Sequence, residues 1–230
     1  MTGAAPAAMV SGNWVARFYG STVGRKIVMA VTGIVLVGFI AIHMSGNLLV
    51  HRGADAMNHY AAFLKSQAPL LWGTRIVVAL ALVLHIHSAL TLTRRAAAAR
   101  PDRYARLTPQ VSTWSARLMR VSGILLAVFV VFHILHVTTG TVLASQFVEG
   151  EAYQNVVRSF SITWVAAFYL ISMMALAMHL HHGIWSLFQT LGANHPHLEG
   201  GRKKLAWLLS VVIPAGFASV PLAVIAGMAR

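Results

Sequence analysis

Cysteine is absent from this sequence of 230 residues. Disulfide bonds, thiolate ligands for iron–sulfur clusters and thioether attachment of haem are therefore excluded within the chain. Structural zinc sites, which commonly use cysteine thiolates, lose a principal ligand for the same reason. Any iron–sulfur centre that works together with this chain must belong to another polypeptide.

Acidic residues are also scarce, with five Asp and Glu against 18 Lys and Arg and a net charge of +13. In a soluble protein this excess would suggest nucleic acid as a partner. Here 13 of the 18 basic residues fall before the first, third and fifth apolar runs, which is the positive-inside pattern. It predicts a cytoplasmic N-terminus in a bacterial cytoplasmic membrane, membrane lipid as a partner of the basic face, and no nucleic acid. The 13 residues are Arg17, Arg25, Lys26, Arg94, Arg95, Arg100, Arg103, Arg106, Arg117, Arg120, Arg202, Lys203 and Lys204.

Polar surface is too limited for a soluble domain, because 57% of the residues are hydrophobic and only 10% are charged. Five apolar runs are long enough to cross a bilayer as helices, which takes about 20 residues. None alternates with the two-residue period of a membrane β-barrel. The sequence predicts an all-α integral membrane protein, a single membrane domain over 1–230, with no cleaved signal at its start. The expected transmembrane helices lie near 27–50, 72–93, 118–144, 162–188 and 204–228.

The segments between these runs carry weaker signals. The stretch Asp55–Ser66 has the pattern of a short helix on the membrane surface, and Trp14–Tyr19 of an interfacial turn. The sequence Arg100-Pro101-Asp102 should end any helix after the second run. Pro214 and Pro221 predict a kink in the fifth helix.

One apolar stretch occurs twice. Thr32 to His43 reads TGIVLVGFIAIH, and Ser122 to His133 reads SGILLAVFVVFH. A second repeat relates His85-Ile-His87 to His179-Leu-His181. The chain is therefore interpreted as a duplicated pair of histidine-bearing helices followed by one extra helix.

Histidine is the ionisable residue of these helices, and ionisable side chains at bilayer depth are costly and usually functional. At about 1.5 Å per residue, His43 and His133 lie roughly 25 Å from the cytoplasmic boundary, and His85 and His179 lie roughly 15 Å from it. Two imidazoles at one depth on facing helices can ligate one haem. The sequence therefore predicts two haem sites, His85/His179 on the inner side and His43/His133 on the outer side.

Other histidines lie close to the predicted ligands, and their roles are not decided by the sequence. His87 lies about 200° around the helix from His85, as His181 does from His179, so only one of each can face the bundle centre. The repeat does not choose between them, because both members recur. His136 and His182 lie one turn from a predicted ligand, where they could contact a cofactor or bond to another helix. A zinc site is disfavoured, since no Asp or Glu lies in any expected span.

The chain resembles the di-haem cytochrome b membrane anchor of succinate:quinone oxidoreductases, in the branch that has one polypeptide and five helices. The resemblance covers nearly the whole sequence. It is carried by Gly24-Arg-Lys26, Thr32-Gly33, His43 with Gly46-Asn-Leu48, His85 with Leu92 and Ala99-Arg-Pro101, Arg120-Val-Ser-Gly123, His133, His179-Leu-His-His-Gly-Ile-Trp-Ser186 and Gly192.

The resemblance implies that His43, His85, His133 and His179 are the axial ligands of two haem b groups. It selects His85 by its spacing to Leu92 and to the proline of Ala-Arg-Pro, and His179 by its spacing to Gly183. It also implies a flavoprotein subunit with FAD and an iron–sulfur subunit, both on the cytoplasmic face. Succinate would be oxidised on the flavoprotein, and menaquinone would accept the electrons, so this chain would carry no succinate-oxidising residues.

Three points stay open after the resemblance. The residues that bind quinone are not selected among His51, Asp55, Asn58 and His136. Ala177 stands where related fumarate reductases have Glu, which argues against a carboxylate proton route. The competing hypotheses are the cytochrome b subunit of a membrane hydrogenase or formate dehydrogenase, and a histidine-lined transporter.

Overall fold

The computed structural model describes residues 13–99, 114–193 and 195–229 of the chain. The described residues are almost entirely helical and contain no strand. Five helices are long and apolar enough to span a membrane, which confirms the expected all-α membrane fold. The elements in order are α1 Trp14–Gly20, α2 Thr22–Asn47, η1 Leu48–Arg52, α3 Ala54–Ser66, α4 Ala68–Ala98, α5 Trp114–His133, η2 Ile134–Thr138, η3 Ala144–Gln146, α6 Ala152–Phe160, α7 Thr163–Thr190 and α8 Pro196–Ile225.

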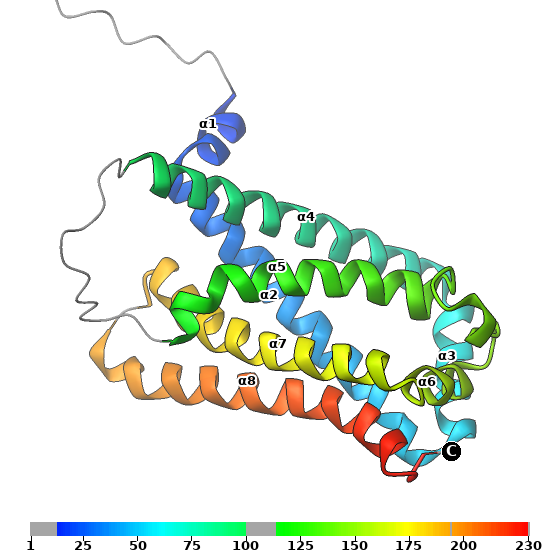
Figure 1. The fold of residues 1–230 in the computed structure, drawn as a ribbon. Helices are drawn as coiled ribbons and strands as arrows, with labels where there is room; N and C mark the ends of the chain where they lie inside the picture. The colour runs from blue at the N-terminus through cyan, green and yellow to red at the C-terminus, as the bar shows by residue number, and fades with distance from the viewer. Residues whose placement is uncertain (1–12, 100–113, 194, 230) are drawn as a thin grey trace, which may run out of the picture.

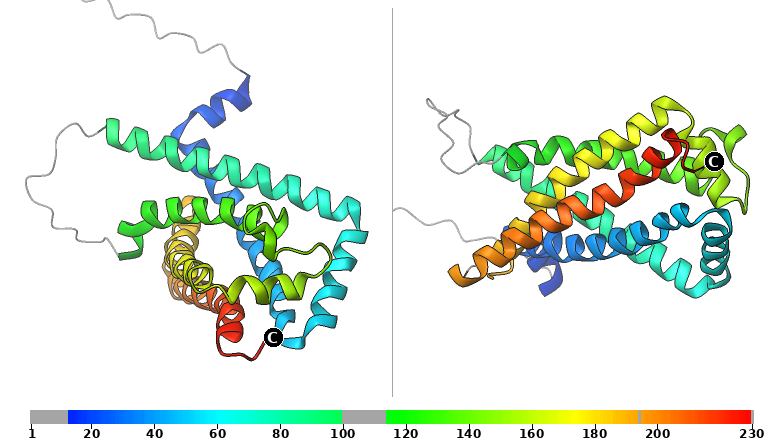
Figure 2. Two further views of the ribbon diagram at one scale, coloured as in Figure 1. Left: turned by 45° about the vertical axis from the view of Figure 1, so that its right-hand side comes forward. Right: turned by 90° about the horizontal axis from the view of Figure 1, so that it is seen from below.

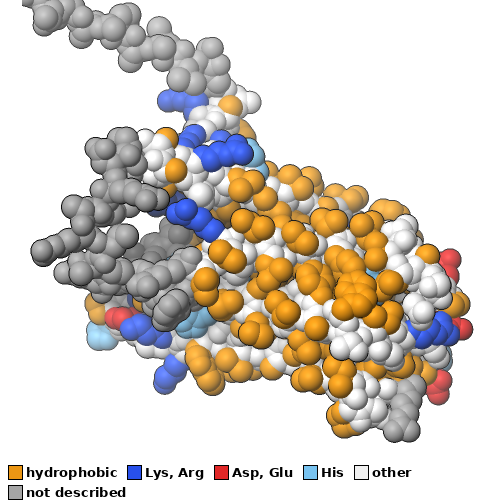
Figure 3. Space-filling view, viewed as in Figure 1, with side chains coloured by type: hydrophobic (Ala, Val, Ile, Leu, Met, Phe, Trp, Pro, Cys, Tyr) orange, Lys and Arg blue, Asp and Glu red, His pale blue; other side chains and the backbone are white. Residues whose placement is uncertain are grey.

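The two ends of the bundle differ in character (Figures 1 and 2). One end gathers α1, the end of α4, the start of α5 and the turn between α7 and α8. The other end gathers the short helices α3 and α6 and the C-terminus. In the face that Figure 3 shows, Lys and Arg side chains are most numerous at the first end, and hydrophobic side chains cover the middle. The fold therefore has the polar ends and apolar belt of a membrane protein.

The five long helices form two halves that match the sequence repeat. In the first half α4 packs along α2, and in the second half α5 and α8 both pack along α7. The halves meet where α2 contacts α7 and α8. Among the described residues, α4 has no extensive contact with α5 or α7. The side chains along the outer faces of these helices, such as Val83, Val128 and Met174, are apolar and exposed, as lipid contact requires.

The extra helix α8 supports α7, and it carries a histidine, His197, in its first turn. Leu180 and Ile184 of α7 pack with Ala206 and Ile213 of α8 in one buried cluster. Small residues on the buried face of α7, among them Ala166, Ser172 and Ala175, are typical of closely packed membrane helices. α7 is thereby fixed between α5 and α8.

The ends of several elements differ from the sequence-based expectation. The third span ends at Thr138 rather than near 144, because the helix loosens into a π-helical turn at Ile134–Thr138 and then meets Gly140 at φ +65°. α8 starts at Pro196 rather than near 204, since His195 caps it and proline suits the first helical position. This start brings Glu199 into the first turn of α8. Pro214 and Pro221 lie buried within α8, which runs through both.

The sequence predicted some of the short helices that lie outside the five spans. α3 agrees with the surface helix expected at Asp55–Ser66, and α1 occupies the expected interfacial turn. The chain turns between α7 and α8 at Gly192, which has φ +80°. α6 was not expected. The helix break expected at Arg100-Pro101-Asp102 lies outside the described residues, as do Arg103 and Arg106.

Candidate functional site

The inner histidine pair joins the two halves of the bundle. His85 on α4 and His179 on α7 place their ring centres 6.4 Å apart. Two metal–nitrogen bonds of about 2 Å, with about 1 Å from each nitrogen to its ring centre, put the rings of a bis-imidazole metal about 6 Å apart. The separation of His85 and His179 therefore fits one metal ion between two imidazoles.

The outer pair has the same character. His43, near the end of α2, and His133, the last residue of α5, place their ring centres 5.9 Å apart. Each ring has a phenylalanine one turn before it on its own helix. Phe39 stacks against His43 with ring centres 5.5 Å apart, and Phe129 lies 5.6 Å from His133. Phe217 of α8 adds a third aromatic ring, 5.7 Å from His43. The second pair therefore also fits two imidazoles on one metal, within an aromatic enclosure.

Hydrogen bonds settle which nitrogen of His85 is free. Nδ1 of His85 lies 3.1 Å from the backbone carbonyl oxygen of Met29, which can only accept. Nδ1 of His85 therefore carries the ring proton and donates it to this carbonyl. Oγ1 of Thr32, 3.2 Å from Nδ1, is a second acceptor. The Thr32 hydroxyl in turn donates to the carbonyl of Val28 at 2.7 Å. The unprotonated nitrogen of His85 is Nε2, which is the form that binds a metal.

His179 has the matching arrangement in the second half. Its Nδ1 lies 3.4 Å from Oγ of Ser122, whose hydroxyl donates to the carbonyl of Met119 at 3.1 Å. Gly33 and Gly123 follow Thr32 and Ser122, and each lies against one of these two rings. A Cβ at either position would be 3.6 Å from Cε1 of the histidine, which is an ordinary van der Waals contact.

The outer histidines are held by different residues. The hydroxyl of Tyr169 lies 3.1 Å from Nδ1 of His133 and 3.1 Å from Nδ1 of His136. A tyrosine hydroxyl has one proton to donate, so at least one of the two histidines must donate its Nδ1 proton to Tyr169. The side-chain amide of Asn47 lies 3.4 Å from the ring nitrogens of His43. Sequence reasoning missed Tyr169, because the corresponding residue of the first half is Arg75 and the repeat gives no signal there.

The remaining histidines lie outside these pairs. His87 is exposed on another face of α4, where its Nδ1 is hydrogen-bonded to the hydroxyl of Tyr19 on α1. His51 forms a hydrogen bond with Ser219, in which Nε2 of His51 lies 2.9 Å from Oγ of Ser219. Among the described residues, no three His, Asp or Glu side chains come together as a closed zinc site would require.

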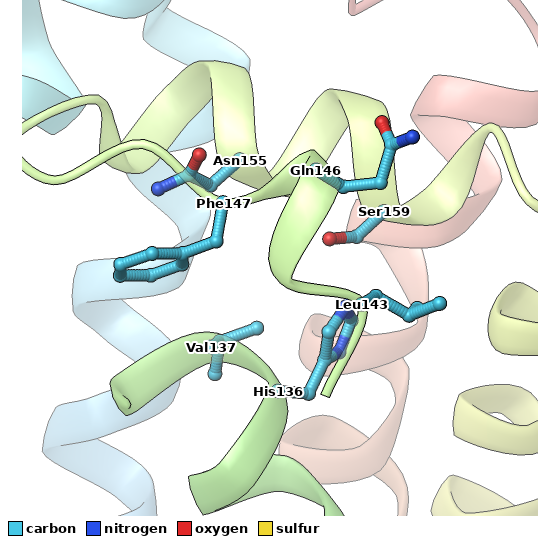
Figure 4. A pocket seen from close by; sticks show the side chains of 7 residues that line it. All are labelled: His136, Val137, Leu143, Gln146, Phe147, Asn155 and Ser159. Atoms are coloured by element: carbon cyan, nitrogen blue, oxygen red, sulfur yellow. The ribbon is translucent and has the colours of Figure 1, made fainter. Parts of the chain in front are cut away.

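A small pocket at the end of the bundle that holds α3 and α6 contains His136 (Figure 4). It is lined by His136, Val137, Leu143, Gln146, Phe147, Asn155 and Ser159. His136 is 3% exposed, and its Nε2 is buried without a hydrogen-bond partner. Of the other candidates for quinone contact, Asp55 is exposed, while Asn58 bonds to Gln154 and to the backbone of Tyr153. The structure does not gather His51, Asp55, Asn58 and His136 into one pocket.

Comparison with known proteins decides the family. The family model described as the succinate dehydrogenase/fumarate reductase transmembrane subunit matches residues 93–218, more than half of the chain. The chain belongs to this family. Its resemblance to a cytochrome b membrane anchor is thereby confirmed. The match starts at the end of α4 and includes α5, α7 and most of α8.

A relative supports the same conclusion. The chain is 26% identical over 166 residues to the succinate dehydrogenase cytochrome b558 subunit of Bacillus subtilis strain 168, covering 70% of this chain and 75% of the relative. No solved structure matches the chain. The protein is therefore a membrane anchor of succinate dehydrogenase/fumarate reductase type.

Proposed function

We propose that this chain is the di-haem cytochrome b anchor that connects an iron–sulfur subunit to menaquinone in a bacterial succinate dehydrogenase. The observation that carries the proposal is the double pairing of histidines, at 6.4 Å and 5.9 Å, across the two halves of one membrane domain. Bound at both pairs, haem b would supply one-electron transfer across the membrane between the iron–sulfur subunit and the quinone. The relative's description as a cytochrome b558 supports haem as the cofactor.

The residues around each pair fit the proposed ligands. His85 and His179 keep Nδ1 bonded and leave Nε2 for iron, as metal-binding histidines do. The limited contact between α4 and the second half is compatible with a flat macrocycle lying between the halves. The aromatic rings at His43 and His133 would exclude water from the outer site. The axial ligands in this proposal are His43, His85, His133 and His179.

The orientation in the membrane follows from charge. Arg25, Arg95 and Lys203 belong to the start of α2, the end of α4 and the first part of α8, which lie at one end of the bundle. Glu149 and Glu151 belong to the loop before α6, at the other end. The positive-inside rule makes the first end cytoplasmic. The iron–sulfur and flavoprotein subunits, which carry the iron–sulfur clusters and FAD, would dock at that end. The chain would then place its inner histidine pair nearer the electron donor.

The proposal is tested by counting haem in the assembled complex. Wild type and the variants His43→Ala, His85→Ala, His133→Ala and His179→Ala are purified with their partner subunits, and succinate is added as reductant. We expect succinate to reduce two haems in the wild type and each variant to lose one. His87→Ala is the matched control for His85→Ala, because it lies on the same helix but contacts Tyr19, and it should retain both haems. Retention of two haems in His85→Ala would refute the assignment.

A further inference from the structure

The repeated dipeptides Thr32-Gly33 and Ser122-Gly123 touch the inner histidines in the same way. Thr32 and Gly33 on α2 lie against His85 of α4, and Ser122 and Gly123 on α5 lie against His179 of α7. At both glycines a Cβ would be 3.6 Å from Cε1 and 3.9 Å from Nδ1 of the neighbouring ring. The two halves of the chain therefore share the same arrangement of hydroxyl, glycine and histidine, although the residues around it differ.

The hydrogen bonds of the Thr32 and Ser122 hydroxyls determine which nitrogen of each histidine carries the proton. Thr32 is 7% exposed and Ser122 is 2% exposed, and each donates its proton to a backbone carbonyl of its own helix. A hydroxyl whose proton is already committed has only lone pairs left to offer. It can therefore only accept from Nδ1 of the histidine. This fixes the proton on Nδ1 and leaves Nε2 unprotonated.

We propose that Thr32 and Ser122 are paired positioning residues of the inner haem, each orienting one axial histidine and fixing its tautomer from the preceding helix of its own half. This inference rests on the proposed function, in which His85 and His179 are the inner ligands. The adjacent glycines, Gly33 and Gly123, lie against the same two rings, where a Cβ would make ordinary van der Waals contact. The outer pair is held by residues of other types, the phenol hydroxyl of Tyr169 at His133 and the amide of Asn47 at His43.

Loss of the Thr32 hydroxyl and loss of the Ser122 hydroxyl should affect the inner haem to different extents. His85 has a second acceptor, the carbonyl of Met29 at 3.1 Å, so it keeps its orientation when the Thr32 hydroxyl is lost. For His179, no second acceptor at Nδ1 is present among the described residues, so the Ser122 hydroxyl alone holds its proton. Removing Ser122 should therefore disturb the inner haem more than removing Thr32.

The test compares Ser122→Ala and Thr32→Val by redox titration and low-temperature electron paramagnetic resonance of the purified complex. Donation from Nδ1 makes an axial imidazole more basic, which favours ferric iron. We expect Ser122→Ala to shift the equilibrium of the inner haem toward the ferrous form by about tenfold, equivalent to about 59 mV for one electron. Thr32→Val should give a smaller shift in the same direction, and the outer haem should stay unchanged. The inner haem is identified as the one that His179→Ala loses.

Controls separate positioning from packing. Ser172→Ala removes another fully buried serine of the bundle, whose hydroxyl bonds to the carbonyl of Phe168, and it should leave both potentials unchanged. Ser122→Thr and Thr32→Ser exchange the two natural residues and should restore wild-type behaviour. An unaltered inner haem in Ser122→Ala, or an equal shift in Ser172→Ala, would overturn the inference. The proposed function would instead fail if His85→Ala and His179→Ala kept both haems.

Discussion

The hydroxyl of Tyr169 lies 3.1 Å from Nδ1 of His133, at the end of α5 where the helix loosens into a π-helical turn. The same hydroxyl lies 3.1 Å from Nδ1 of His136, which is buried one turn further on. The ring of Tyr169 is fixed by edge-on contacts with Phe129 and Phe160, at 5.0 Å and 4.9 Å. One rigid side chain of α7 thus sets the position of two histidines of α5 and η2.

Replacing Tyr169 by Phe should weaken the outer haem site and leave the inner site intact. The substitution keeps the ring but leaves Nδ1 of His133 without its partner, and the loss of such a partner typically costs 10–100-fold in metal affinity. The measurement is haem content per chain during stepwise haem extraction, where the outer haem of Tyr169→Phe should dissociate first. Tyr19→Phe removes a hydroxyl at the inner end of the bundle and serves as the control. Equal loss from both sites would contradict this role for Tyr169.

Gly24 sets the angle between α1 and α2. A Cβ at this position would overlap the backbone carbonyl oxygen of Phe18, and backbone atoms cannot yield as a flexible side chain can. Gly24→Ala should therefore detach α1 from α2 and expose Trp14–Gly20 to protease and to hydrogen exchange. Gly20→Ala is the matched control, because a Cβ there meets nothing within 4 Å. Unchanged protection of α1 in Gly24→Ala would show that the corner is not fixed by this contact.

Asn58 ties the two short helices at the outer end together. Its side-chain amide donates to Oε1 of Gln154 at 3.1 Å, and its oxygen accepts from the backbone N–H of Tyr153 at 2.9 Å. Asn58→Ala removes both bonds and should lower the free energy of unfolding by about 1–3 kcal/mol. Thermal unfolding in detergent measures the loss, with the exposed neighbour His59→Ala as control. A melting temperature equal to that of the control would mean that α3 and α6 are held by apolar packing alone.

Much of the fold was readable from the sequence, because the length and apolarity of a membrane span leave few alternatives. All five spans and the surface helix at Asp55–Ser66 were anticipated on these grounds. The end of α5 was not, since a π-helical turn is a local adjustment that hydropathy does not register. α6 was also not predicted, because its nine residues are too few for an apolar run that spans a membrane.

The histidine pairs followed from repeat and depth, which fix where a residue lies along a helix. The structure places the rings of each predicted pair side by side, and their role as haem ligands stays a prediction. What surrounds each ring was harder to foresee. Thr32 and Ser122 stand out in the repeat, but their contact with a histidine depends on how α2 meets α4 and α5 meets α7. The residue that corresponds to Tyr169 in the first half is Arg75, so neither periodicity nor the repeat could mark Tyr169.

The central claim is that one chain holds two haem b groups, and haem stoichiometry tests it most directly. The measurement is a reduced-minus-oxidised visible spectrum of the purified complex, with a pyridine haemochrome assay related to the amount of this chain. Two haems per chain, with the sharp bands of low-spin b-type haem, are predicted by the pairs His43/His133 and His85/His179. A single haem would mean that one pair does not bind iron, and a folded complex without haem would contradict the account.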